Sequence, residues 1–421
     1  MRVAFATLGC KVNHYETQAM AELFLDAGWE IVPFDAPAEA YVVNTCTVTA
    51  ASDAKSRQLL RRAAARTPGA AVAAVGCYAQ SAPDDVAALP GVSLVAGTSA
   101  RAAIVQRVTA AVNGNSGAYV EDISKASFEP LSAVRDGRTR ATLKIQDGCV
   151  NYCAYCIIPY VRGPLRSRPP GEVEAALRAL AQEGYKEVVL TGIHLASYGR
   201  DLGGETDLIG ALRLAEGVEG LERLRLGSLE PGFVDERFAE AAAGCRKLCD
   251  QFHLSLQSGS DGVLRRMRRR YTAEGFMRSA ALLREALPGC ALTTDVIAGF
   301  PGETEREHRE SLAFCREIGF SRMHVFPYSA RPGTAAAAME GQIERSVREA
   351  RARELVSLGK TLAREYLDRQ RGRVLELLVE REGMGYARNY VLVRAGGEPG
   401  EIRRARITAV EKETLIGEEV E

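Results

Sequence analysis

Residues 147–156 read Asp-Gly-Cys-Val-Asn-Tyr-Cys-Ala-Tyr-Cys and place Cys149, Cys153 and Cys156 in one short loop. Three thiolates at C-x3-C-x2-C spacing can hold three corners of a 4Fe–4S cube. The run has no fourth cysteine, so one iron would keep an open position for a ligand. A zinc loop is the alternative, but the soft ligands and their spacing favour iron–sulfur.

The cysteine loop follows the first strand of a β/α series. Apolar runs predict strands over 141–146, 187–191, 221–226, 251–256, 291–297 and 322–326. Helical patterns lie between most of them, and six such units fit an incomplete β/α barrel better than an open sheet. Barrel active sites lie where the strands end, which is where the cysteines stand. We place this central domain at 135–361.

The first part of the chain, residues 1–115, is a separate α/β domain. Apolar runs predict strands over 3–8, 41–44 and 71–75, and helical patterns cover 16–27, 50–65 and 99–112. This alternation predicts a parallel, Rossmann-like sheet covered by helices. Residues 113–127 are polar and contain glycine, which is typical of a linker.

A second group of cysteines, Cys10, Cys46 and Cys77, is dispersed over this first domain. Each follows a predicted strand directly. Ligands of open parallel sheets bind outside the carboxyl ends of the strands, so the three thiols could converge on a second cluster with a free iron. Three buried, apolar cysteines are the alternative, because cysteine is among the most buried residue types.

The last part of the chain, 362–421, changes character. A helical pattern over 344–373 precedes strand-like runs over 374–380, 389–394 and 402–410, joined by Gly-rich turns. These features predict a small all-β, OB-like barrel appended to the α/β domains.

Composition and charge exclude several classes of protein. Lys+Arg and Asp+Glu are both 54, so any nucleic-acid site must be a local patch. No apolar run approaches the roughly 20 residues of a membrane helix, and the N-terminus lacks a secretory pattern. Ten cysteines in such a chain favour metal or redox chemistry over disulfides. We expect a cytoplasmic, soluble protein.

Together these segments resemble the methylthiotransferases of the radical S-adenosylmethionine superfamily. The cysteine run with its aromatic Tyr155 looks like the superfamily signature, and residues 7–17, 44–49 and 75–80 resemble the N-terminal domain of the methylthiotransferases. The terminal β region resembles their TRAM domain, an RNA-binding barrel. Four barrel segments match the family in order: IQDGCVNYCAYCIIPYVRG, HLSLQSGSDGVLRRMRRRY, DVIAGFPGET and FPYSARPGT.

The family branch is indicated mainly by Lys11, Val12 and Asn13. GCKVN next to Tyr-Glu-Thr resembles the branch that modifies N6-threonylcarbamoyladenosine in tRNA. The branch acting on isopentenyladenosine typically shows Gln-Met-Asn, and the branch acting on a ribosomal-protein aspartate shows Pro-Lys-Asn.

The resemblance implies two 4Fe–4S clusters and two S-adenosylmethionines. One cluster, on Cys149, Cys153 and Cys156, would cleave S-adenosylmethionine to a radical that removes hydrogen from adenine C2. The other, on the dispersed cysteines, would carry the sulfur, and a second S-adenosylmethionine would supply the methyl group. The implied partners are the anticodon loop of tRNA, an external electron donor and a sulfur source, with a monomeric enzyme and no membrane.

Further residues at strand ends are candidates for contact with S-adenosylmethionine, although each could instead be structural, for instance a helix cap. These candidates are Tyr155, Thr191, Gly192, Glu230, Gln257, Ser258 and Asp295. We expect His194 to be structural, and no pair of histidines is spaced like a metal site.

Basic residues give weaker indications. Arg162, Arg166 and Arg168 follow the cysteine loop and could meet cofactor or substrate. The arginine run at 265–270 reads as a solvated helix face unless RNA lies there. Arg388, Tyr390 and Arg394 lie along one strand and are expected to contact RNA, with the tyrosine stacking on an unpaired base.

Three alternatives stay open. The chain could belong to a sister methylthiotransferase branch, or it could be a zinc-structured RNA-binding protein without catalysis. It could also be a radical enzyme with one cluster, if the dispersed cysteines do not converge.

Overall fold

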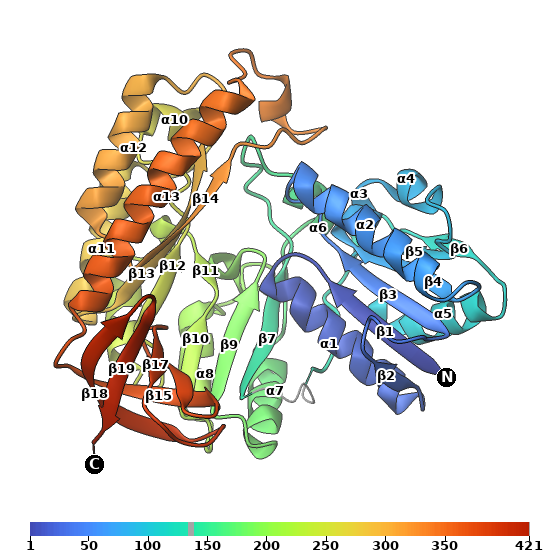
Figure 1. Ribbon diagram of the computed structural model, residues 1–421, viewed down its shortest axis with the longest axis horizontal. Coiled ribbons are helices and arrows are strands. Elements are labelled where there is room, and N and C mark those ends of the chain that lie inside the picture. The colour runs from blue at the N-terminus through green and yellow to red at the C-terminus, as the bar shows by residue number, and fades with distance from the viewer. Residues whose placement is uncertain (134–138, 421) are drawn as a thin grey trace.

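The computed structural model describes residues 1–133 and 139–420, which form two α/β bodies and a small β-barrel (Figure 1). The expected start of the central domain at residue 135 lies outside the described residues. No helix in the described part is long and apolar enough to cross a membrane.

The N-terminal body is a six-stranded parallel sheet with the order β2-β1-β3-β4-β5-β6. Its strands are β1 Arg2–Thr7, β2 Glu30–Val32, β3 Ala40–Thr45, β4 Ala71–Gly76, β5 Leu94–Ala96 and β6 Gly117–Tyr119. This order is the flavodoxin-like variant of the doubly wound sheet, whose switch point lies between β1 and β3. The predicted parallel α/β sheet is confirmed.

Helices cover both faces of this sheet. They are α1 Lys11–Asp26, α2 Ala50–Arg66, α3 Cys77–Ser81, α4 Pro83–Ala87 and α5 Ile104–Val112. One apolar cluster joins α1 and α5 to the sheet, and another joins α2, α3 and α4 to the opposite face. Every residue of β3 and β4 is therefore buried, which explains their continuous apolar sequence.

The expected linker at 113–127 is partly wrong. Its residues β6 Gly117–Tyr119 extend the sheet by pairing with β5. Only three residues pair, and two of them are exposed, so neither length nor apolar content marked them as a strand. The N-terminal body therefore continues past the expected boundary at 115.

The central body carries six β/α units. Its strands are β7 Arg140–Asp147, β8 Arg166–Ser167, β9 Glu187–Gly192, β10 Arg223–Leu226, β11 Ser228–Leu229, β12 Gln251–Leu254, β13 Ala291–Ala298 and β14 Arg322–Pro327. They form two four-stranded sheets, β10-β9-β7-β8 and β11-β12-β13-β14, which Gly227 joins between β10 and β11. No pairing between β7 and β14 closes the ring in the described residues, so the barrel is incomplete as predicted.

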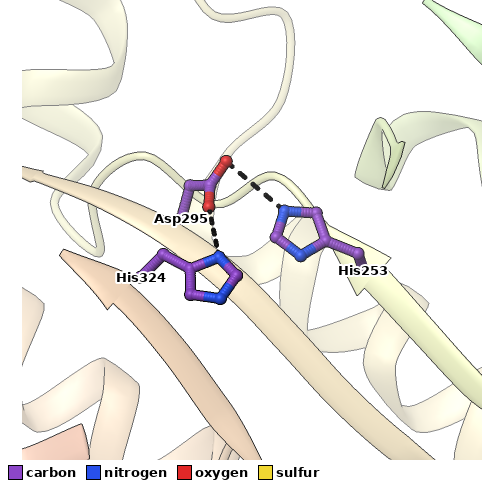
Figure 2. A group of neighbouring side chains, drawn as sticks. All are labelled: His253, Asp295 and His324. Atoms are coloured by element: carbon purple, nitrogen blue, oxygen red, sulfur yellow. Dashed lines mark hydrogen bonds and ion pairs between the residues drawn. The ribbon is translucent and has the colours of Figure 1, made fainter. Parts of the chain in front are cut away.

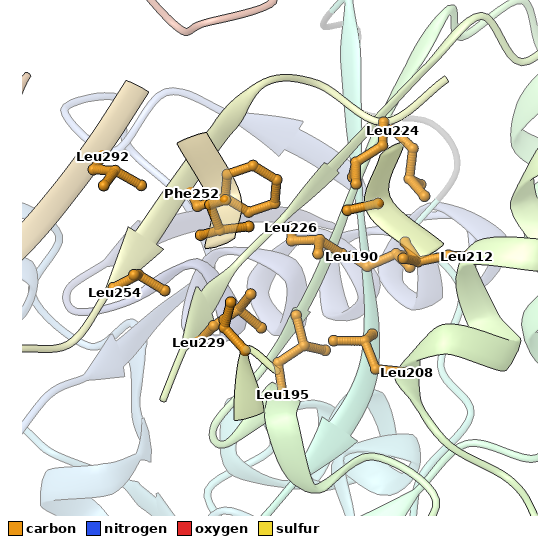
Figure 3. Packing of buried hydrophobic residues seen from close by; sticks show 14 of the residues in the cluster. Leu190, Leu195, Leu208, Leu212, Leu224, Leu226, Leu229, Phe252, Leu254 and Leu292 are labelled. Atoms are coloured by element: carbon orange, nitrogen blue, oxygen red, sulfur yellow. The ribbon is translucent and has the colours of Figure 1, made fainter. Parts of the chain in front are cut away.

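The helices of the central body lie outside the strands (Figure 1). They are α6 Ile158–Arg162, α7 Pro170–Gln182, α8 Leu208–Glu216, α9 Glu236–Gly244, α10 Asp261–Arg266, α11 Ala273–Ala286, α12 Glu305–Ile318 and α13 Arg345–Asp368. Leucines on alternate strand positions, such as Leu190, Leu224 and Leu254, form the core (Figure 3). Because strand side chains alternate between faces, the polar residues between these leucines face the interior of the barrel.

The C-terminal body is a closed barrel with the order β15-β16-β17-β19-β18. Its strands are β15 Val374–Arg381, β16 Met384–Ala387, β17 Leu392–Arg394, β18 Ile402–Glu411 and β19 Thr414–Glu419. Five strands in a closed barrel agree with the expected OB-like domain. The expected boundary at 361/362 falls inside α13, whose Tyr366 and Leu367 pack into the core of this barrel.

The N-terminal body docks beside the barrel through α1, which lies against β7 and β9 (Figure 1). A second contact lies further along the chain, where the Arg331 guanidinium donates to the Asp53 carboxylate at 2.6 Å and to the Thr47 hydroxyl at 2.8 Å. The loop of the N-terminal sheet that carries Cys46 thus comes close to the mouth of the barrel.

Candidate functional site: two cysteine trios at a domain interface

The loop that carries Cys149, Cys153 and Cys156 begins directly after β7 and is held by backbone contacts. Gly148 has a φ of +75°, and a Cβ on it would lie 1.7 Å from the Pro164 carbonyl oxygen, so only glycine fits. The Cys149 N–H donates to Gly163 O at 3.0 Å, and the Cys156 N–H donates to Cys153 O at 2.9 Å. The three thiols therefore share one compact loop.

These thiols lie in a setting that suits a metal and disfavours free thiolates. Burial, together with repulsion from the charge of Cys153, raises the pKa of Cys149 to about 11. Burial likewise raises the pKa of Cys156 to about 12, with added repulsion from Cys153 and Cys149. Three such thiols ionise together only when a metal centre supplies the compensating positive charge.

Cys10, Cys46 and Cys77 also come together, at the carboxyl ends of β1, β3 and β4. A Cβ on Gly9, next to Cys10, would lie 3.2 Å from Cys46 Sγ. Burial, together with repulsion from the charges of Cys10 and Cys46, raises the pKa of Cys77 to about 11. Cys10 and Cys46 flank the switch point of the sheet, which is where a doubly wound fold places its ligand.

The spread of the sulfur atoms argues against zinc at either trio. In the described residues, the only group of three metal-binding side chains whose ligand atoms all lie within 4.8 Å of one another contains no cysteine. Thiolates on one tetrahedral zinc, with bonds of about 2.3 Å, would lie about 3.8 Å apart. The wider arrangement suits a cluster of several irons, so both donor sets fit a 4Fe–4S group.

Asn13 ties the cysteine-bearing loops of the N-terminal sheet together. Its amide nitrogen donates to Leu8 O at 2.8 Å and to Thr45 O at 3.0 Å, one residue before Cys46. In turn, the Asn44 side chain donates to Asn13 O at 2.9 Å. Asn13 thus fixes the relative position of two loops that the sequence keeps more than thirty residues apart.

A buried network of charges joins the two trios. Arg162 ends α6 and forms a two-pronged ion pair with Glu16 of α1, at 2.6 and 3.0 Å. Lys144 lies 3.0 Å from Glu16 and 3.1 Å from Asp147, and Arg101 lies 2.8 Å from Glu16. Arg101, Arg162 and Lys144 hold the pKa of Glu16 at about 2 despite its burial. The sequence did not indicate this network, because its members are scattered over three segments.

The other two arginines after the cysteine loop are buried as well. Arg166 lies 3.4 Å from Asp147, and Arg168 donates to Leu131 O at 3.3 Å. Each guanidinium group nevertheless keeps two buried nitrogens without a hydrogen-bond partner in the described residues, so contact with a cofactor or substrate stays a prediction for both.

Glu230 connects the cysteine loop to the ends of two barrel strands. It accepts from Asn151 at 3.2 Å and from His194 at 3.0 Å, and pairs with Arg269 at 3.1 Å. These partners lower the pKa of Glu230 to about 2 against the effect of burial. His194 Nδ1 also lies 2.6 Å from the Ser197 hydroxyl, so both ring nitrogens have partners within the protein, and the structural role of His194 stays a prediction.

Three other predicted cofactor residues lie at the same mouth of the barrel, namely Thr191, Gly192 and Gln257. Thr191 and Gly192 end β9, and a Cβ on Gly192 would lie 2.8 Å from the Gln146 side chain. Gln257 has a φ of +66°, and its N–H donates to Asp295 O at 2.9 Å. Backbone groups are therefore fixed at these positions.

Two of the predicted cofactor residues have side chains engaged elsewhere. The Ser258 hydroxyl lies 3.1 Å from that of Ser311 in α12. Tyr155 packs edge to face against Phe300, with ring centroids 6.5 Å apart, and burial raises its pKa well above the usual value. Both side chains hold the cysteine loop and its neighbours in place.

Asp295 lies between two histidines that the sequence did not pair (Figure 2). His324 Nδ1 is 3.2 Å from one carboxylate oxygen, and His253 Nε2 is 3.4 Å from the other. The two imidazoles hold the pKa of Asp295 well below its usual range, although burial raises it. Spacing along the sequence marked no pair of histidines, because only the pairing of β12, β13 and β14 brings these distant residues to one level of the barrel.

The arginine run at 265–270 is only partly a solvated face. Arg265, Arg268 and Arg270 are exposed, whereas Arg266 pairs with Glu307 at 2.8 Å. Arg269 points inward, and its Nη1 lies 3.1 Å from Cys153 Sγ. One arginine of the run therefore belongs to the cysteine site.

The expected RNA-contact face on the C-terminal barrel is wrong for two of its three residues. Arg388 donates to the Leu248 carbonyl at 2.7 Å, in the central body. The Tyr390 ring lies under Arg225, 4.6 Å from the guanidinium carbon, and under Arg140 at 5.1 Å. Tyr390 docks the barrel onto β7 and β10, Arg388 docks it onto the segment before β12, and of the three residues only Arg394 is exposed.

Lys11 is a cation of this region with no ion pair in the described residues. It is the first residue of α1 and directly follows Cys10. Burial lowers its pKa, and its electrostatic neighbours are Tyr390, Arg225 and Arg140, together with Glu187. A positive charge thus faces the interior of the barrel beside the dispersed cysteines.

Comparison with protein families gives two matches. Residues 143–315 match the family described as the radical SAM superfamily. Residues 2–97 match the uncharacterized protein family UPF0004.

Similar chains are found over nearly the full length. The threonylcarbamoyladenosine tRNA methylthiotransferase MtaB of Bacillus subtilis is 45% identical over 93% of this chain and 89% of its own. The protein of the same name from Thermotoga maritima is 36% identical over 98% of this chain and 96% of its own. A tRNA-2-methylthio-N(6)-dimethylallyladenosine synthase of Streptomyces viridosporus is 36% identical over 98% of this chain and 83% of its own.

Solved structures with the same fold are more distant. The radical S-adenosylmethionine methyltransferase TsrM of Kitasatospora setae superposes with a TM-score of 0.55 at 16% identity, over 80% of this chain and 77% of its own. The cobalamin-dependent S-adenosylmethionine radical enzyme OxsB gives 0.51 at 11% identity, over 86% of this chain and 56% of its own. These likenesses establish the fold of the two α/β bodies and nothing finer.

Proposed function

Because this chain belongs to the threonylcarbamoyladenosine tRNA methylthiotransferase family of radical S-adenosylmethionine enzymes, we propose that it adds a methylthio group to C2 of N6-threonylcarbamoyladenosine next to the anticodon. The observation that carries this function is the meeting of two cysteine trios at one domain interface, with Arg162 in contact with both regions. A one-cluster enzyme would need only the loop after β7.

We propose that Cys149, Cys153 and Cys156 hold the cluster that binds S-adenosylmethionine, and that Cys10, Cys46 and Cys77 hold a second cluster. The enzyme uses 4Fe–4S clusters and S-adenosylmethionine. When bound, the first cluster supplies the electron that cleaves S-adenosylmethionine, and the second supplies the sulfur. The protein orients both groups and keeps water away from the radical.

The residues at the barrel mouth have separate tasks in this proposal. Thr191, Gly192 and Gln257 offer fixed backbone groups for the cofactor. Glu230 and Asp295 offer carboxylates that stay ionised at neutral pH, which suits hydroxyl or amine groups of a ligand. Tyr155 and Ser258, which we also keep as cofactor-site residues, act by shaping the loop.

Lys11 supports the choice of nucleoside. A threonylcarbamoyl group ends in a carboxylate, whereas a dimethylallyl group is uncharged. An unpaired ammonium group beside Cys10 suits the charged substituent.

Each of the three bodies has a separate proposed role. We propose that residues 1–115, extended by β6, hold the second cluster, and that 135–361 is the radical domain. Residues 362–421, in which the barrel begins at Val374, bind tRNA through surfaces other than Tyr390. We further propose an external electron donor, a separate sulfur source, a monomeric state and a cytoplasmic location, where tRNA is available.

Metal content tests the two-cluster site. The full-length protein is reconstituted anaerobically, and iron and sulfide are measured for wild type and for a Cys10/Cys46/Cys77 triple alanine variant. About eight irons in wild type and about four in the variant are expected. About four in both would overturn the second cluster, and bound zinc without sulfide would favour a structural metal.

Nucleoside analysis tests the substrate. tRNA from a deletion strain is digested and analysed by mass spectrometry, with and without the plasmid-borne gene. Accumulated N6-threonylcarbamoyladenosine without its methylthio derivative is the expected result. Loss of the methylthio derivative of dimethylallyladenosine instead would assign the chain to the sister branch.

A further inference from the structure

Arg162 belongs to the cysteine-loop segment and contacts a cysteine of the other trio. It lies six residues after Cys156, at the end of α6. Its Nε lies 3.4 Å from Cys77 Sγ, and its side chain is 0% exposed. No solvent competes for this contact, so the N–H is directed at the sulfur.

The remaining nitrogens of Arg162 fix this orientation. Nη1 and Nη2 lie 2.6 and 3.0 Å from the two oxygens of Glu16, and Nη2 also donates to Asn13 Oδ1 at 2.7 Å. Nη1 additionally lies 3.3 Å from Asp147. A planar guanidinium held at its two terminal nitrogens has its Nε–H direction set, which a lysine ammonium could not reproduce.

The charges around Arg162 do not balance by themselves. Arg101, Lys144, Arg162 and Arg166 are four buried cations, and the carboxylates that pair with them are Glu16, Asp147 and the partly exposed Glu129, which lies 3.8 Å from Arg101. An uncompensated buried charge is costly, so the interface lacks negative charge in its present form. Three thiolates around an iron–sulfur core of charge 2+ leave the cluster net negative and supply part of what is missing.

We infer that Arg162 is a positioning residue of the second cluster: its Nε–H holds Cys77 Sγ in place and shifts the reduction potential of that cluster to more positive values. Hydrogen bonds to cluster sulfurs and nearby positive charge both favour the reduced, more negative state. The inference depends on the proposed function in one respect, which is that Cys77 is a ligand of a cluster.

The contact also links the two halves of the site. Because Arg162 belongs to the segment that follows Cys156, a movement of that loop would be transmitted to Cys77 through one side chain. One buried guanidinium with five polar contacts therefore connects the two cysteine regions.

The test uses the full-length chain with Cys149, Cys153 and Cys156 replaced by alanine, so that spectra report the second cluster alone. Arg162→Gln and Arg162→Lys are made in this background. Arg101→Gln is the matched control, because Arg101 is a buried cation that also pairs with Glu16 but contacts no cysteine. Each protein is reconstituted, and its midpoint potential is measured by redox titration with electron paramagnetic resonance detection.

We expect Arg162→Gln to move the midpoint to more negative values and to release iron faster to a chelator. Arg162→Lys should lie between it and the parent, and Arg101→Gln should shift the midpoint less than Arg162→Gln. Equal midpoint potentials for the parent and Arg162→Gln would overturn the inference. A shift in Arg101→Gln as large as that in Arg162→Gln would also overturn it, because it would show a general effect of charge.

Two further readouts separate this inference from its premise. A parent protein that holds no iron would overturn the second cluster itself. If Arg162→Gln binds no cluster, the midpoint potentials of Arg162→Lys and Arg101→Gln are compared instead. Arg162→Lys keeps the positive charge and loses the planar guanidinium, so a larger midpoint shift in this variant supports the hydrogen bond. A smaller shift overturns the inference.

Discussion

Lys144 Nζ lies 3.0 Å from Glu16 Oε1, and both side chains are almost completely buried between the N-terminal domain and the barrel. Glu16 also pairs with Arg162 and Arg101, so one carboxylate compensates three cations contributed by separate segments. Arg101 belongs to the N-terminal domain, whereas Lys144 and Arg162 come from the central body, so this carboxylate forms ion pairs on both sides of the interface.

Replacing Glu16 by glutamine should destabilise this interface strongly. Removing one partner of a buried ion pair leaves uncompensated charge and typically costs about 3–5 kcal/mol. Thermal unfolding of the apo protein should show a lower Tm for Glu16→Gln. Glu39→Gln is the control, because its pair with Arg2 is about two-fifths exposed and surface pairs contribute at most about 1 kcal/mol. Similar losses in both variants would contradict the prediction.

Acid should weaken the cysteine loop through Glu230. Its pKa is lowered from 4.5 to about 2 in the folded protein, so its contribution is complete above the unfolded value and is lost as pH falls from about 4.5 toward 2. The corresponding stabilisation is at most about 3 kcal/mol. The Tm of wild type should fall more steeply over this range than that of Glu230→Gln. Glu236→Gln, which removes an exposed pair with Arg278, should keep the wild-type slope.

Gly148 should not tolerate a side chain. A Cβ there would overlap the Pro164 carbonyl oxygen, and the positive φ adds strain. We expect Gly148→Ala to lose about half of the bound iron after reconstitution while the second cluster remains. Gly232→Ala is the control, since nothing lies within 4 Å of its added carbon. Full iron content in Gly148→Ala would show that the loop can move aside.

Tyr390 should act in domain docking. Its ring contacts Arg140 and Arg225, and cation–π contacts of this kind contribute about 0.5–2 kcal/mol each. Tyr390→Ala should lower the Tm, while Arg394→Ala, at an exposed position, should leave it unchanged. In tRNA binding by fluorescence anisotropy, Arg394→Ala should weaken affinity more than Tyr390→Ala. The reverse order would restore base stacking as the role of Tyr390.

Lys11 should distinguish a charged from an uncharged substituent. We expect wild type to bind an anticodon stem-loop with threonylcarbamoyl adenosine more tightly than one with plain adenosine. Lys11→Gln should reduce that preference about tenfold or more, because a hydrogen bond to a charged group contributes about 1.5–3 kcal/mol and about 1.4 kcal/mol is tenfold. Lys55→Gln, on the exposed side of α2, is the control. An unchanged preference in Lys11→Gln would remove Lys11 from substrate recognition.

The sequence by itself determined which residues supply the chemistry. Cysteine spacing and the position of each cysteine after a strand follow from local patterns, because an apolar strand and the loop after it are read from neighbouring residues. Strand positions in the barrel agreed with the structure to within a few residues, and the family followed from the same motifs. The strand that the sequence did not predict, β6, is short and exposed. It has three residues, and an apolar pattern of that length does not indicate a strand.

Only the tertiary structure decided how those residues act together. The approach of Arg162 to Cys77 joins positions 85 residues apart, and its pair with Glu16 spans 146. The same holds for Asp295 between His253 and His324, and for Tyr390 beneath Arg225. Sequence fixes the local geometry of each element, but contacts between elements depend on how whole domains pack, and packing is set by the combined burial of many side chains that no single segment contains.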